Sequence, residues 1–172
     1  MKKFEFTDEF ITDTFGNNLF RIKALVDFGT IRAGELGGFA EKEENLSNND
    51  NAWVYGDAQV SGNAQVSGDA QVSGDARVSG DARVYGDAWV SGNADFAVVE
   101  GFGRQFRATT FFRCKDKILR VQCGCFYGDL AQFREIVKKT HGDSKYAKEY
   151  LAIADLMELH FSDEEGRQEV TE

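Results

Sequence analysis

The chain has 172 residues, of which 42% are hydrophobic, and it contains 18 glycines and no proline. This composition excludes a disordered chain and a proline-rich linker, and the length suits one folded unit with its own core. The formal net charge of −9 disfavours a non-specific nucleic-acid binder. Three cysteines are too few for a secreted disulfide scaffold, and neither a signal peptide nor a membrane span is evident, so we expect a cytoplasmic protein.

Residues 1–50 are expected to form a β-rich N-terminal cap. Residues 3–11 and 19–28 are rich in β-forming side chains, and the Gly-Asn-Asn sequence between them predicts a hairpin turn. An acidic loop at 41–50 follows. We expect this cap to cover the first coil of the repeat described next, because an exposed strand edge invites aggregation.

Residues 51–98 repeat with a period of six. Seven hexads follow the pattern [DN]-A-x-V-[SY]-G, and an eighth, NADFAV, is decayed. A helix would lose about 1 kcal/mol at each glycine, whereas a parallel β-helix with three hexads per coil fits the period. Alanine and valine lie two apart, so they point to the interior, while the residue between them and the residue after valine face solvent. Glycine and Asp/Asn form the corners.

Residues 99–161 are expected to form a C-terminal cap of a β-hairpin followed by two helices. The hairpin is predicted within 108–125, across a Lys-Asp-Lys turn. Asp129, followed three residues later by glutamine, predicts the start of the first helix through a capping box. The second helix is predicted to begin near Asp143, and the polar tail 162–172 is expected to fray.

The hexads resemble the left-handed β-helix of the hexapeptide-repeat proteins, in which a small residue follows an aliphatic one four positions later, as Ala58 follows Val54. The chain also resembles, over nearly all its length, a group of uncharacterised hexapeptide-repeat proteins from phage and prophage genomes. The matching segments include LFRIKALVDFG, AGELGGF and CGCFYGDLAQFREIVKKTHGDSKYAKEYL. This resemblance implies a mainly β fold, a short left-handed parallel β-helix between the two caps, in the cytoplasm of a bacterial host cell. It implies no activity.

Residues that could carry chemistry are few. Hexapeptide acyltransferases generally use a histidine on the β-helix as general base, but His141 and His160 both lie in the helical region, so we expect no enzyme activity. Cys123 and Cys125 would lie about 6.6 Å apart along a strand, too far for a zinc ion whose sulfurs lie about 2.3 Å from the metal. Together with Cys114 they are expected to be core residues, and no metal or cofactor is expected.

The outer surface of the repeat is the remaining candidate. Residues 18 apart stack, so Trp53 and Trp89 share a column with Gln71 between them, and outward tryptophans are either covered or used for binding. Residues 1–97 carry 16 acidic and 8 basic residues, which favours a basic partner. The predicted partner-binding residues are Trp53, Tyr55, Arg77, Arg83, Tyr85, Trp89, Asp57, Asp69, Asp75, Asp81 and Asp87.

The sequence therefore predicts a non-catalytic β-helix interaction protein that binds a host protein. The resemblance implies that the chain is encoded by a phage or prophage, and for such a chain the expected role is inhibition of a host defence or nucleic-acid enzyme. Direct nucleic-acid and membrane binding are not expected. A homo-oligomer, dimer or trimer, is expected because hexapeptide β-helices commonly pair through flat faces, and Trp53, Tyr55 and Trp89 offer such a face. Two alternatives remain open, namely a hexapeptide acyltransferase with its base off the solenoid, and a structural spacer or virion component.

Overall fold

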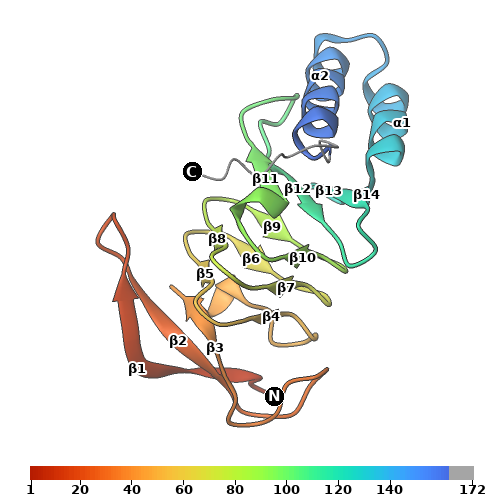
Figure 1. Cartoon of the computed structure of the whole chain (residues 1–172). Coiled ribbons are helices and arrows are strands. Elements are labelled where there is room, and N and C mark those ends of the chain that lie inside the picture. Colours follow the sequence, from red (N-terminus) through yellow and green to blue (C-terminus); the bar gives the residue numbers. More distant parts are fainter. Residues whose placement is uncertain (163–172) are drawn as a thin grey trace, which may run out of the picture.

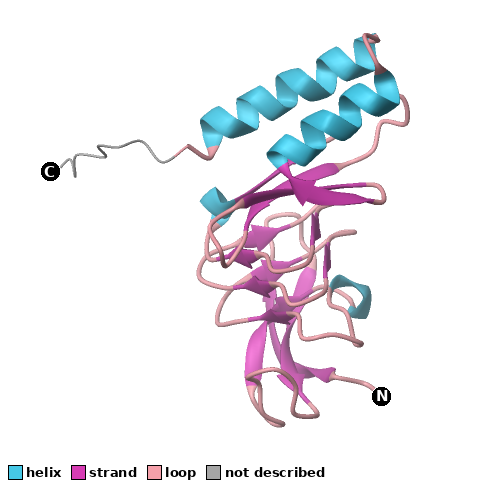
Figure 2. Ribbon diagram, turned by 90° about the vertical axis from the view of Figure 1, so that its right-hand side faces the viewer, coloured by secondary structure: helices cyan, strands magenta, loops and turns pink. Residues whose placement is uncertain are grey.

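The computed structural model describes residues 1–162, which form an elongated molecule (Figure 1). An N-terminal sheet lies at one end, the six-residue repeat in the middle, and a sheet that carries two helices at the other end (Figures 1 and 2). The predicted polar tail, 162–172, lies outside the described residues except for Ser162. Within 1–162, no helix has the length and apolar character needed to cross a membrane.

The repeat forms a parallel β-solenoid of two-residue strands. Its rungs are β4 (Trp53–Val54), β5 (Gln59–Val60), β6 (Gln65–Val66), β7 (Gln71–Val72), β8 (Arg77–Val78), β9 (Arg83–Val84) and β10 (Trp89–Val90). They stack on three faces, which we name face one (β4, β7, β10), face two (β5, β8) and face three (β6, β9). Neighbouring rungs are 18 residues apart, as in the pairs of Gln71 with Trp53 and with Trp89. The hexad period and its three-sided stacking are therefore confirmed.

Small apolar side chains fill the interior of the solenoid. Every alanine and valine of the hexads from Ala58 to Val90 is 0% exposed, as predicted. The corners need glycine, as Gly68 illustrates, because its φ of +75° is left-handed and a Cβ there would lie 2.8 Å from the backbone nitrogen of Gly86. Alternation of apolar and polar residues at period two thus places one column of alanines and one of valines inside each face.

The N-terminal sheet continues directly into the solenoid. The predicted hairpin is formed by β1 (Phe4–Thr12) and β2 (Asn18–Ala24), and β3 (Leu36–Ala40) then pairs in parallel with β5 of face two. The resulting sheet has the order β1-β2-β3-β5-β8. After the short helix η1 (Glu43–Asn45), Leu46 bridges to Val66 of face three. Faces two and three therefore receive backbone hydrogen bonds from preceding segments.

Beyond the solenoid lies an antiparallel sheet with the order β11-β12-β13-β14. Its strands are β11 (Phe96–Val99), β12 (Thr109–Arg113), β13 (Leu119–Cys123) and β14 (Phe126–Asp129). The predicted hairpin within 108–125 corresponds to β12 and β13, and the strands on either side of it were not predicted. The eighth hexad does not form a rung, because residues 93–95 form the short helix η2 (Asn93–Asp95) and residues 96–99 join this sheet.

Helices α1 (Leu130–His141) and α2 (Lys145–His160) cover the side of this sheet that faces away from the solenoid (Figure 2). The predicted capping box is confirmed, since the Asp129 carboxylate accepts from the backbone N–H of Gln132 at 2.8 Å and Gln132 Oε1 accepts from the Asp129 N–H at 2.9 Å. The second helix begins after Ser144, whose side chain accepts from the Ala147 N–H. Phe133 and Val137 of α1 pack against Ile153 and neighbouring apolar residues of α2.

Candidate interaction surface

Face one carries the most exposed aromatic side chain of the solenoid. Trp89 lies on β10, the rung nearest the helical end, and 50% of it is exposed. Gln71 lies beneath it on β7, and Trp53 lies on β4 at the far end of the same column. The predicted column is therefore confirmed, but its two tryptophans differ in environment.

Trp53 is fully buried, so the prediction that it is an exposed binding residue is wrong. Its indole packs edge-on against Phe28, with ring centroids 5.3 Å apart. Gly37 of β3 lies so close that a Cβ there would come within 2.7 Å of the indole. The indole Nε1–H has no hydrogen-bond partner among residues 1–162. The N-terminal segment thus covers one end of face one and leaves Trp89 exposed at the other.

Two columns of corner residues run along the edges of face one. Each column combines aspartates with one asparagine, and the columns are Asn51, Asp69, Asp87 and Asp57, Asp75, Asn93. In the first column the Asn51 amide relieves the stacking of like charges, since Asn51 Nδ2 donates to Asp69 Oδ1 at 2.9 Å. In the second column Asn93 Nδ2 donates to the backbone carbonyl of Asp75 at 3.4 Å. The Asp57 carboxylate also lies 3.6 Å from the Arg21 guanidinium. Face one therefore lies between aspartates on both edges.

The remaining predicted residues lie elsewhere on the solenoid. Arg77 is on face two and Arg83 on face three, and Asp81 belongs to the corner between them, where it accepts from Asn63 Nδ2 at 3.0 Å. Residues 51–92 consequently place no lysine or arginine on face one. The predicted residues do not form one continuous site.

The two tyrosines lie at the edges of the repeat faces. Tyr55 is half-buried and packs against the solenoid core. Tyr85 is 44% exposed and stacks edge-on with Tyr127 of β14 at 5.1 Å. Since Tyr85 immediately precedes the Gly86–Asp87 corner, it lies around that corner from Trp89. The structure therefore brings together Trp89, Tyr85 and the aspartates that flank face one.

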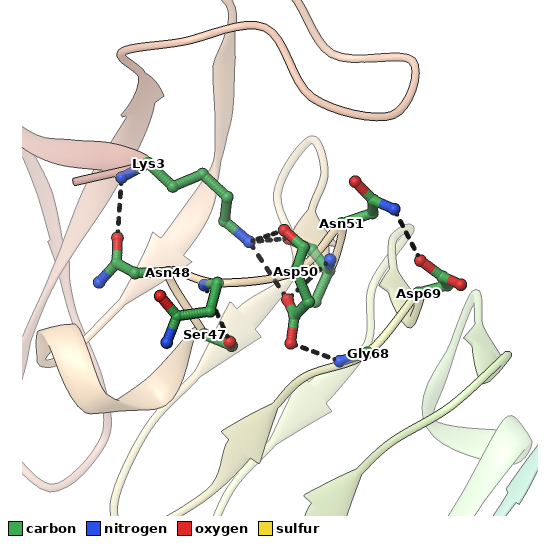
Figure 3. Close-up of polar contacts among 9 residues, drawn as sticks. Lys3, Ser47, Asn48, Asp50, Asn51, Gly68 and Asp69 are labelled. Atoms are coloured by element: carbon green, nitrogen blue, oxygen red, sulfur yellow. Dashed lines mark hydrogen bonds and ion pairs between the residues drawn. The ribbon is translucent and has the colours of Figure 1, made fainter. Parts of the chain in front are cut away.

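Lys3 ties the N-terminus to the first rung of face one (Figure 3). The side chain is only 3% exposed, and its ammonium donates to the Ala52 carbonyl at 2.7 Å and to the Asp50 carbonyl at 3.1 Å. Asp50 Oδ2 in turn accepts from the Gly68 backbone N–H at 2.6 Å. Face one has no preceding rung to bond Ala52, so the ammonium takes the place of the missing N–H. Nothing in the sequence pattern identified this contact.

Burial shifts the pKa of one lysine and of one cysteine. Desolvation lowers the pKa of Lys3, against the opposing effect of the Asp50 carboxylate. Cys114 is buried, as predicted, and desolvation raises the pKa of its thiol. Cys123 is half-buried, whereas Cys125 is exposed in the β13–β14 turn, so the prediction of a core position is wrong for Cys125. The turn arises because Gly124 adopts a φ of +59° and ends the strand.

The histidines lie at the helix ends. The His141 ring stacks on Tyr150 at 5.8 Å with an interplanar angle of 29°, and His160 packs edge-on against Phe161 at 4.9 Å. Among the described residues, no three side chains of His, Cys, Asp or Glu gather as a metal site would require.

Residues 58–74, 70–82 and 76–92 match the family model of the YdcK beta solenoid repeat. The matched span covers the middle of the solenoid and leaves both terminal sheets unmatched. A search of curated proteins found no match to the chain. The match and the parallel stacking of the rungs agree that this chain is a β-solenoid repeat protein, mainly β, with two helices at its C-terminal end.

Proposed function

We propose that the protein is a non-catalytic interaction protein that binds a basic surface of a partner protein through face one. The observation that carries the proposal is the half-exposed Trp89 between two corner columns that each hold two aspartates. Tryptophans that become buried on contact commonly dominate binding energy, and flanking charges steer an oppositely charged partner toward them. Tyr85, around the corner, extends the aromatic surface.

The charges on face one favour a basic partner over a second copy of the chain. A symmetric dimer through face one would bring Asp69, Asp75 and Asp87 of both copies together, and like charges at an interface oppose association. The dimer or trimer that the sequence leads us to expect would therefore use another surface. Sedimentation at micromolar concentration, with Trp89→Ala as a comparison, tests this point.

The charge distribution along the molecule supports the same proposal. Residues 1–97 carry 16 acidic and 8 basic residues, whereas residues 98–162 carry 8 acidic and 11 basic residues. A partner with a basic cleft, such as a nucleic-acid enzyme of a bacterial host, would be attracted to the solenoid and repelled by the helical end. Inhibition of such an enzyme by a phage-encoded or prophage-encoded chain is the role we propose.

We also infer that the coil is left-handed and that the terminal sheets act as caps. The left-handed sense follows the resemblance to hexapeptide-repeat proteins. The capping role is supported by the bonds of β3 to β5 and of the Lys115 N–H to the Asp87 carbonyl at 3.1 Å, which occupy strand edges at both ends.

The test compares binding of a partner captured from bacterial lysate to wild type and to matched variants. We expect Trp89→Ala to weaken binding about 30-fold, corresponding to a loss of about 2 kcal/mol. The control is Phe15→Ala, which removes an 89% exposed aromatic ring from the β1–β2 turn, away from face one. Binding through face one should be unchanged in the control.

A second pair of variants tests the charges. Asp75→Asn on the edge of face one should weaken binding at low salt and lose its effect at high salt, because exposed charges are screened. Asp81→Asn, at the corner between faces two and three, should have no such effect. The proposal is contradicted if the affinity for the partner is the same at low and high salt and is unchanged in Trp89→Ala and Asp75→Asn.

A further inference from the structure

A pocket of about 340 Å³ lies at the helical end, and no residue of face one lines it. It opens between the loop that joins β11 to β12, the inner side of α1 and the β13–β14 turn. Its lining residues are Arg104, Gln105, Arg107, Cys123, Cys125, Phe126, Phe133, Ile136, Val137, Thr140, His141 and Tyr150. This volume falls within the range of small-molecule sites, about 300–1,000 Å³.

The inner part of the pocket is aromatic and apolar. The Phe133 ring contacts Phe126, with centroids 5.7 Å apart, and packs edge-on against Tyr150 at 5.8 Å. The His141 ring stacks on Tyr150, with centroids 5.8 Å apart. Burial raises the pKa of Tyr150 to about 12. A flat or apolar group would be desolvated here.

The rim of the pocket is cationic. Arg104 and Arg107 both project from the β11–β12 loop, and neither guanidinium has an ion-pair partner within residues 1–162. No aspartate or glutamate of the described chain lines the pocket. Guanidinium groups bind carboxylates and phosphates with planar, paired hydrogen bonds, so an anionic group fits this rim.

Several contacts hold the arginine-bearing loop in place. The Gly103 N–H donates to Glu149 Oε2 of α2 at 2.9 Å, and the Tyr150 hydroxyl lies 3.5 Å from the Phe102 carbonyl. The Arg107 guanidinium lies against Gly124, where a Cβ would overlap it. Phe106, 70% exposed, adopts a φ of +54°, a conformation that costs a non-glycine residue about 1–3 kcal/mol. The fold therefore keeps both arginines at the rim despite backbone strain.

We propose that this pocket binds a small organic anion in which a carboxylate or phosphate is attached to an aromatic or apolar body. The anionic group lies between Arg104 and Arg107, and the body lies on Phe126, Phe133 and the Tyr150 ring. This site is separate from the one proposed on face one, and neither requires the other.

Calorimetric titration of the purified chain with simple probes tests the proposal. Phenylacetate and phenyl phosphate represent the two anionic groups, phenylacetamide is the neutral analogue, and inorganic phosphate lacks the apolar body. We expect at least one aromatic anion to bind about tenfold or more tightly than both phenylacetamide and inorganic phosphate, and the stronger of the two identifies the preferred group. Bound probe should also slow alkylation of Cys125, which is exposed at the rim.

Matched variants locate the site. Arg107→Gln and Arg104→Gln should each weaken binding about tenfold, because each removes a charge-assisted hydrogen bond to the anionic group. Ile136→Glu, at a 37% exposed position on the pocket wall, should abolish anion binding without disturbing the core. The control is Lys138→Gln, which also removes one positive charge at the helical end of the molecule. Because Lys138 does not line the pocket, binding should be unchanged in this variant. Melting temperatures confirm that each variant is folded.

Three results would overturn the proposal: no binding of either aromatic anion, equally tight binding of phenylacetamide or inorganic phosphate, or equal losses in Lys138→Gln and the pocket variants. Trp89→Ala should bind the probes as tightly as wild type does. The result therefore distinguishes a failure of the face-one proposal from a failure of the pocket proposal.

Discussion

Replacing Lys3 by methionine should lower the free energy of unfolding by about 2–3 kcal/mol. Two effects oppose each other. Removing the ammonium relieves a desolvation penalty, but the carbonyls of Ala52 and Asp50 lose a donor, and a buried polar group without a partner costs about 1–3 kcal/mol. The Asp50 carboxylate is less affected, because it keeps the backbone N–H groups of Gly68 and Ala52. The loss of the hydrogen-bond donor to these two carbonyls therefore outweighs the relieved desolvation penalty, and the variant is expected to be less stable than wild type.

Thermal and urea unfolding measure this loss. For a chain of this length, each 1 kcal/mol shifts the melting temperature by about 2–4 °C, so a decrease of about 4–12 °C is expected. The matched control is Lys2→Met, because Lys2 pairs with Glu43 at an exposed position where the pair contributes about 1 kcal/mol at most. Equal losses in the two variants, or a Lys3→Met protein as stable as wild type, would refute the reasoning.

The pH dependence gives an independent check on the same residue. Because burial lowers the pKa of Lys3 below 10.5, the folded state releases this proton at lower pH than the unfolded state. Between those two pKa values the unfolded state binds more protons, so wild type should gain stability relative to Lys3→Met as the pH rises toward 10.5. A difference that shrinks over this range would contradict the direction of the shift.

Three further outcomes are expected. Trp53→Ala should cost about 3–5 kcal/mol of stability, whereas Trp89→Ala should cost about 1 kcal/mol or less, because only Trp53 is fully buried; equal melting temperatures would contradict this. Val72→Asp should abolish the β circular-dichroism signal, since it places an unpaired charge in the dry interior; a folded variant would contradict this packing. Burial raises the pKa of Tyr150 to about 12, so its contribution to stability is present below pH 10 and is lost as the pH rises to 12. Over that range, Tyr150→Phe should show a shallower fall in melting temperature than wild type, and identical slopes would contradict the assignment.

The solenoid could be predicted from sequence because the residue pattern that determines it lies within each hexad. The alanine and valine of each hexad are two residues apart, and that spacing alone places them inside a strand-based coil. The start of α1 was equally local, since Asp129 and Gln132 form their capping box within one turn. Each of these features depends on residues fewer than six positions apart.

Features that depend on distant segments were not predictable. Trp53 and Trp89 occupy the same hexad position, and only the approach of Phe28 and Gly37 makes one of them buried. The strand pattern through Cys123 and Cys125 continues past Gly124 in the sequence, but the left-handed glycine turns the chain back. The pocket likewise depends on a loop and a helix that are more than 25 residues apart in the chain.

The direction of the hydrogen bonds in the solenoid has a mechanical consequence. Each rung bonds to the next along the long axis, as Trp53 N–H does to the Ala70 carbonyl and Gln71 N–H to the Ala88 carbonyl. A pulling force applied between the N-terminal sheet and α2 therefore loads these bonds one rung after another instead of shearing many at once. In an optical trap, we expect the chain to extend at low force in steps of about 18 residues, the spacing between stacked rungs.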